Sequence, residues 1–212
     1  MTAFDSSDLT QPHLATEALS MQDLNGLLKI HLQRRVSALP SICFTEIDQA
    51  FLVWGALTLI IFSLAQFSAI DWNQQAILDA GLTGMGIATT SGLTWTLASA
   101  EKLRWVIFLW AGLMSVAAIV TVYGIFYSSV LILSNLCLLW LGVCAAGYGA
   151  MAVGMQSRSF TAACLVHLAA IAGLEYAYSW QFFGSGLVMA MTLFFFSVVP
   201  WDMQASENDI PC

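Results

Sequence analysis

Three ionisable side chains stand inside long apolar stretches of this sequence, where a charge is costly. Asp79, His167 and Glu175 each have mostly apolar neighbours. A carboxylate in such surroundings takes up a proton or pairs with a cation, so residues of this kind are candidates for function. Asp79 and Glu175 both lie roughly 6–9 Å from one end of their segments at helical rise, with Asp71 just beyond. We therefore expect an acidic cluster that could bind a proton, a metal cation or a cationic ligand.

The alternative for this acidic cluster is structural. Each carboxylate would then hydrogen-bond a neighbouring hydroxyl, amide or interfacial water. No Lys or Arg lies on the same side to neutralise the carboxylates.

His167 is a second candidate, because a histidine can bind a metal or a cofactor. It lies three residues after Cys164, so a helix would present both side chains on one face. Cys144, in the preceding apolar segment, is expected at a comparable depth. Two thiolates and an imidazole could ligate zinc, and a lone histidine could hold haem iron or a chlorophyll magnesium. The simpler alternative is a buried histidine with one hydrogen bond and two inert thiols. The sequence does not identify a cofactor.

The composition places these residues in a membrane. Of the 212 residues, 59% are hydrophobic and 9% are charged, against roughly 45–50% and about 25% in soluble domains. So few charges could not cover the surface of a water-soluble fold, which excludes a soluble enzyme.

Six apolar segments are each long enough to cross a bilayer as a helix. A crossing needs roughly 20 apolar residues, because the hydrocarbon core is about 30 Å thick and each residue rises about 1.5 Å. The segments lack the two-residue alternation of a transmembrane barrel. The second segment has the weakest apolar signal. The sequence thus predicts an all-α, polytopic membrane protein with a six-transmembrane-helix bundle, at 49–68, 74–98, 104–124, 126–153, 160–179 and 183–200.

The chain outside these segments divides into shorter regions. Residues 1–20 are a polar tail that we expect to be disordered. Leucines recur at helical spacing within 21–40, which predicts an amphipathic juxtamembrane helix on the cytoplasmic surface, or one packed on the protein or a partner. The transmembrane domain then covers 41–201, and 202–212 form an acidic tail.

The basic residues predict an orientation. All six precede the first segment or lie between the second and third or the fourth and fifth. Lys and Arg resist translocation, so these sites should be cytoplasmic, with both termini inside, in a membrane of the bacterial inner or thylakoid type. The six are Lys29, Arg34, Arg35, Lys102, Arg104 and Arg158.

The second and fourth segments also carry small residues spaced by four, which let helices approach closely in lipid. We expect these faces to pack against a helix of this chain, of a second copy or of another membrane protein. The two sets are Ala80, Gly84, Ala88 and Gly92, and Gly142, Ala146, Ala150 and Gly154.

These features favour a non-enzymatic accessory, assembly or stabilising subunit of a larger membrane complex. One alternative is a small proton- or cation-coupled transporter or channel that uses Asp79 and Glu175. Another is a pigment- or haem-binding membrane protein centred on His167. The sequence has no HExxH motif and no P-loop, which argues against a metalloprotease and a nucleotide hydrolase. It has no lysine within a spanning segment, which excludes a retinal protein. No basic, aromatic-interleaved surface suggests nucleic acid, so the expected partners are the lipid bilayer and membrane proteins.

Overall fold

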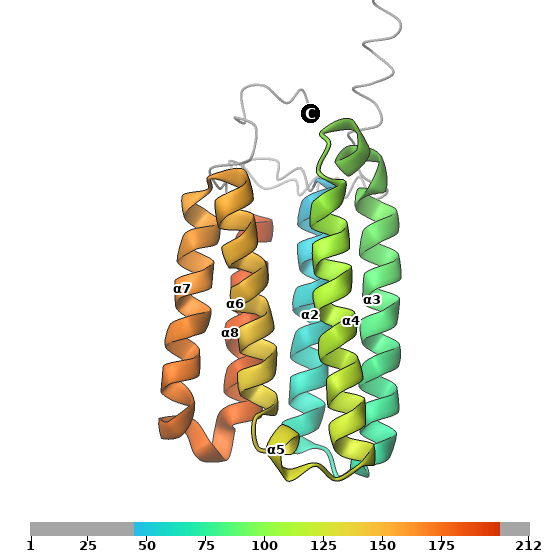
Figure 1. Ribbon diagram of the computed structural model, residues 1–212, viewed down its shortest axis with the longest axis vertical. Helices are drawn as coiled ribbons and strands as arrows, with labels where there is room; N and C mark the ends of the chain where they lie inside the picture. Colours follow the sequence, from blue (N-terminus) through green and yellow to red (C-terminus); the bar gives the residue numbers. More distant parts are fainter. Residues whose placement is uncertain (1–44, 200–212) are drawn as a thin grey trace, which may run out of the picture.

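A computed structural model describes residues 45–199 of the chain, and the regular secondary structure in that range is helical. Six long helices run side by side along one axis (Figure 1). The predicted helix at 21–40 and both predicted tails lie outside the described residues. The long helices are α2 (Glu46–Phe67), α3 (Trp72–Ala100), α4 (Arg104–Phe126), α6 (Leu136–Met155), α7 (Arg158–Gly173) and α8 (Gln181–Val198), and the short elements are α5 (Val130–Leu133) and the 3-10 helix η1 (Leu174–Trp180).

Four helical runs in the described range are long and apolar enough to cross a membrane. They are α2, α4, α6 and the run Arg158–Val198, which contains α7, η1 and α8. The less apolar α3 is not among them. These runs support the prediction of a helical protein compatible with membrane integration. Six crossings stay a prediction.

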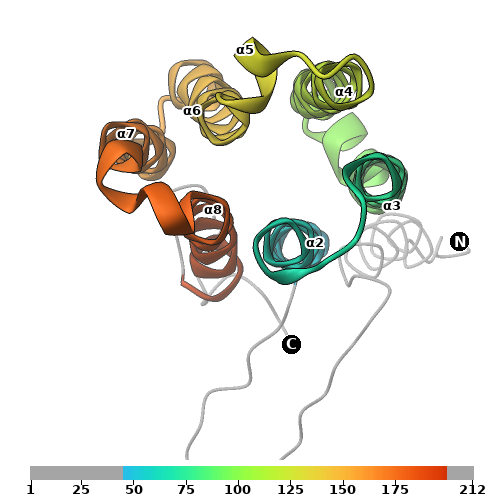
Figure 2. The ribbon, with the colours of Figure 1, turned by 90° about the horizontal axis from the view of Figure 1, so that it is seen from below.

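Viewed along the axis, the long helices form a ring in chain order, and α8 closes it by packing on α2 (Figure 2). Successive long helices are antiparallel, so both ends of the described chain lie at one end of the bundle (Figure 1). Lys102, Arg104 and Arg158 lie at this same end, because they stand at the α3–α4 and α6–α7 connections. We call it the basic end, and the opposite one the far end.

Short polar side chains cap the N-termini of three of the described helices. Thr45 and Asp48 form a capping box at α2, in which the Thr45 hydroxyl accepts from the Asp48 amide at 3.2 Å and the Asp48 carboxylate accepts from the Thr45 amide at 2.9 Å. Asp71 caps α3 by accepting from the Asn73 amide at 3.0 Å, and Ser157 caps α7. Each cap satisfies amides that have no partner within the helix.

The fourth expected segment, 126–153, is not one helix. The α4 helix ends at Phe126, and α6 begins only at Leu136. Between them Ser128 has a φ of 50°, and the side-chain Nδ2 of Asn135 donates to the Leu131 carbonyl at 2.8 Å. Serine and asparagine side chains that bond to nearby backbone compete with a regular helix, which hydropathy alone does not register.

The fifth expected segment, 160–179, also ends early as an α-helix. The α7 helix stops at Gly173, and the chain continues as η1. Ala177 there has non-helical backbone angles, φ −107° and ψ 29°, and the chain turns back into α8.

Aromatic rings packed over glycines set the spacing between α4 and α6. The Trp110 indole of α4 lies over Gly147, and the Trp105 indole lies over Gly154. A Cβ atom on Gly147 would stand 2.7 Å from Cη2 of Trp110, and one on Gly154 would stand 2.6 Å from Cη2 of Trp105. Both contacts therefore require a residue without a side chain.

Similar close contacts occur where α2 packs against its two neighbours, α3 and α8. Its Leu57 side chain and Trp54 indole pack over Gly86 of α3, and the Cβ of its Phe62 packs over Gly186 of α8. In return, the Phe194 ring of α8 packs over Gly55 of α2. Ring-on-glycine contacts thus join α2 to both of its neighbours.

We expect Gly147→Ala to make the protein less stable than Gly142→Ala, by about 1–3 kcal/mol. Both variants gain the same helix propensity on α6, but a Cβ on Gly142 meets nothing within 4 Å. The difference therefore reports the clash with Trp110 alone. Unfolding of the detergent-solubilised protein measures it, and equal stability of the two variants would contradict the packing.

Candidate functional site

The interior of the ring contains a cavity of about 200 Å³ whose wall includes residues of all six long helices. On α2 the wall runs from Ile47, in the first turn at the basic end, to Phe62. That stretch is roughly 22 Å long at helical rise. The cavity therefore extends from the basic end past the middle of the bundle.

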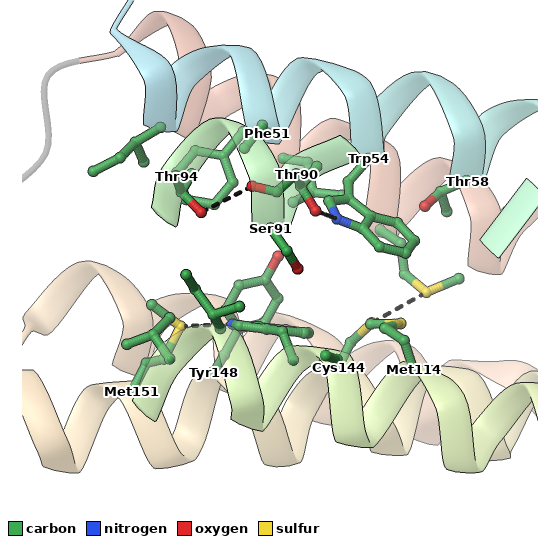
Figure 3. A pocket seen from close by; sticks show the side chains of 18 of the residues that line it. Phe51, Trp54, Thr58, Thr90, Ser91, Thr94, Met114, Cys144, Tyr148 and Met151 are labelled. Carbon is green, nitrogen blue, oxygen red and sulfur yellow. Dashed lines mark hydrogen bonds between the residues drawn. The ribbon is translucent and has the colours of Figure 1, made fainter. Parts of the chain in front are cut away.

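The wall is mainly apolar, and its three indole N–H groups are used within the protein (Figure 3 shows two of these bonds). Each indole donates to a side chain of a neighbouring helix, and the rings present carbon to the cavity. These bonds are Trp54 Nε1 to Thr90 Oγ1 at 3.1 Å, Trp110 Nε1 to Met151 Sδ at 2.9 Å and Trp140 Nε1 to Thr121 Oγ1 at 3.2 Å.

Most other polar groups of the wall are satisfied locally. The Thr90 hydroxyl donates to the Gly86 carbonyl at 2.8 Å, and the Thr94 hydroxyl donates to the Thr90 carbonyl at 2.9 Å. The Cys144 thiol lies 3.5 Å from the Met189 sulfur. Such groups offer little to water or to a polar ligand.

Tyr148 on α6 differs from these groups. Its side chain is 2% exposed, and its hydroxyl points across the cavity toward Ser91 of α3 (Figure 3). Within residues 45–199, neither hydroxyl makes a hydrogen bond. Sequence reasoning missed this pair. The available signal was a tyrosine in the middle of an apolar segment, away from the interface where tyrosines gather.

Neighbouring aromatic rings hold Tyr148 in place. The ring centroid of Trp110 lies 5.2 Å away, that of His167 5.1 Å and that of Phe196 5.9 Å. A tyrosine packed on several rings has little freedom to move its hydroxyl elsewhere.

The predicted carboxylates do not form one cluster. Asp79 is half-buried on α3, hydrogen-bonds the Gln75 side chain and has its Oδ1 atom buried without a partner. Asp71 is the exposed cap of the same helix, whereas Glu175 is exposed in η1. The α3 helix and the α7–η1 segment stand on opposite sides of the ring (Figure 2). The cluster was predicted from the positions of Asp79 and Glu175 along their helices, but these helices lie on different sides of the ring, so the two carboxylates are far apart.

His167 is fully buried, and its Nδ1 atom lies 2.8 Å from the Ala163 carbonyl one turn earlier. Its Nε2 atom has no hydrogen-bond partner. His167 lines neither the central cavity nor the groove described below. In the described part of the chain, no three His, Cys, Asp or Glu side chains come together to hold a metal ion, so the candidate ligands Cys144, Cys164 and His167 are not gathered into one site.

The predicted small-residue faces point largely outward. On α3, Gly84, Ala88 and Gly92 are exposed, and Ala80 is half-buried. On α6, Ala146, Ala150 and Gly154 are exposed and Gly142 is half-buried, and of the two glycines only Gly154 has a close neighbour, Trp105. An open groove of about 840 Å³ lies between α3 and α4, with Ala80, Gly84, Ser115 and Ala118 in its wall.

Comparisons with protein families, with curated proteins and with solved structures find no match to this chain.

We expect Asp79→Asn to keep or raise the free energy of unfolding, by up to about 1 kcal/mol, because it removes a half-buried charge with an unpartnered oxygen and keeps the shape. Glu175→Gln, at an exposed position, should change nothing. Thermal unfolding in detergent measures both. A clear loss of stability in Asp79→Asn would show that the carboxylate has a bound cation.

Proposed function

We propose that this chain is a non-enzymatic, six-span membrane protein that assembles with, or stabilises, a larger membrane complex. The observation that carries the proposal is the outward face of α3. This face combines small and polar side chains at exposed positions, and a groove lies beside it.

Six crossings are supported by how the helices pack. The α3 helix packs against both α2 and α4, which are themselves apolar enough to span a membrane. Its 29 residues amount to about 44 Å of helix, enough for the full bilayer. The run Arg158–Val198 turns back at η1, so α7 and α8 supply one crossing each.

The outward face of α3 is poorly suited to lipid. Besides its exposed Gly84, Ala88 and Gly92, it exposes the hydroxyls of Thr89 and Thr96. Glycines offer lipid chains little contact surface, whereas a second helix can pack closely on them and accept hydrogen bonds from threonine. Large apolar side chains, which suit lipid, are exposed on the other helices and also on α3, where Ile77 and Met85 are examples.

The groove between α3 and α4 extends this surface. Small residues of both helices line part of it, and the exposed Tyr123 and Tyr127 stand at its far end. The rest of the wall is apolar, with Ile87, Ile119, Val122 and Phe126. Close approach of two backbones needs the small residues of this lining. We therefore assign the groove to a transmembrane helix of a partner protein.

Leucine substitutions on α3 test this assignment. In a gentle native purification we expect Gly84→Leu and Gly92→Leu to reduce the co-purifying partner at least several-fold, because the added side chains keep the partner helix away. The monomer should stay folded, since a Cβ at either position meets nothing within 4 Å. Ala169→Leu, at an exposed position on α7, is the matched control. Retention of the partner by all three variants, or a wild-type protein that is a lone monomer, would contradict the proposal.

We further propose that the basic end faces the cytoplasm. Lys102, Arg104 and Arg158 at this end resist translocation, and the far-end connections in the described range carry no Lys or Arg. The proposal places both termini inside.

Single cysteines in a variant without the five native cysteines test this orientation. An impermeant maleimide should label Ser179→Cys, at the far end, in intact cells or right-side-out vesicles. It should label Ala100→Cys, at the basic end, only after permeabilisation. Both positions are exposed. The reverse labelling pattern would show the opposite orientation.

A further inference from the structure

We propose that the central cavity binds a lipid-soluble molecule with an apolar body and one hydroxyl or carbonyl oxygen, and that Tyr148 and Ser91 bind this oxygen. The proposal goes beyond assembly through α3, since a partner on the outward face needs no ligand inside the ring.

The wall selects an apolar body. Among the residues of 45–199 that line the cavity, none is charged and none is a histidine. The indole donors are bonded to protein atoms and do not face the interior as free donors. A volume of about 200 Å³ equals roughly seven molecules of liquid water, but apolar cavities of this size stay dry and accept small apolar molecules. Ions and polar metabolites would find no compensation for lost hydration.

The Tyr148 hydroxyl is a polar contact point on this wall, which also carries the hydroxyls of Thr58 and Thr83. It is held in the cavity by the rings packed around it, and its side chain is 2% exposed. Ser91 lies across from it on α3 (Figure 3). The Tyr148 hydroxyl makes no hydrogen bond within residues 45–199, and an oxygen placed between the two hydroxyls would supply a partner to both. Ligand sites typically combine an apolar wall with a few polar groups of this kind.

The position of the cavity indicates where such a molecule enters. At the basic end the wall is formed by Ile47, Leu97, Leu103 and Val106, at the ends of α2, α3 and α4. These side chains are apolar, and the hydroxyl pair lies deeper in the bundle. A molecule that enters at this end passes these apolar side chains before it reaches the pair.

Two brominated probes of equal chain length test the proposal. Bromohexanol carries a hydroxyl, bromohexane does not, and bromine quenches tryptophan fluorescence on contact. Trp54, Trp110 and Trp140 line the cavity and report its occupancy. We expect saturable quenching of the purified full-length protein by bromohexanol, reversed by excess unbrominated hexanol. Its affinity should exceed that of bromohexane by about 5-fold, the value of one net hydrogen bond.

Variants separate the site from partition into detergent. Tyr148→Phe and Ser91→Ala should each bring the affinity for bromohexanol close to that for bromohexane. The control Tyr123→Phe, on an exposed ring of α4, should behave as wild type. Ala111→Phe adds a ring to the wall and should abolish saturable quenching by both probes. Thermal unfolding confirms that each variant is folded, and Ser91→Ala decides the question if Tyr148→Phe is not. Quenching without saturation, or equal quenching in wild type, Ser91→Ala and Ala111→Phe, would overturn the proposal.

Discussion

Aromatic rings packed on glycines of a neighbouring helix determine how closely the helices of this ring approach. Trp110 on Gly147 and Trp54 on Gly86 place bulky indoles at the seams between helices. In lipid, where apolar surface alone does not drive helices together, such close packing is what joins them. The same indoles form much of the inner wall. Their N–H groups bond to side chains of the neighbouring helices, which fixes the orientation of each indole ring. The rings therefore present carbon atoms to the cavity.

The α3 helix explains why this bundle differs from a set of equally apolar helices. On the inner side of α3, the Thr90 hydroxyl accepts a hydrogen bond from the Trp54 indole and so helps to join α3 to α2. On its outer side, a Cβ on Gly84 or Gly92 would meet no atom of the described residues within 4 Å. Both features lower the hydropathy of α3, and the first follows from a contact that a helix facing only lipid would not make. The weak apolar signal of 74–98 in the sequence therefore reflects a polar contact on one face and small residues on the other.

The candidate site shows which inferences from sequence hold. Position along the chain predicted that Asp79 and Glu175 lie near the same end of the bundle, and both lie toward the far end, Asp79 in the first third of α3 and Glu175 in η1. Their separation on opposite sides of the ring depends on helix order and rotation, which position along the chain does not determine (Figure 2). A transporter hypothesis that joins these two carboxylates thus lacks a shared site. For His167, the bond to Ala163 agrees with the simpler alternative of a buried histidine with one hydrogen bond.

Hydropathy and charge along the chain predict that the described residues are helical and apolar enough for a membrane. They also predict where α2, α3 and α4 begin and end to within a few residues, and that the basic residues of the described range gather at one end. Which side chains face the interior emerges only from how the helices pack. Only there do Tyr148 and Ser91 point toward one another, and only there do the small residues of α3 prove to face outward. The physical reason is that a helix in a bilayer can be apolar all around, because lipid and protein interior are equally apolar. Hydropathy then carries no information on rotation about the helix axis, and packing between neighbours supplies it.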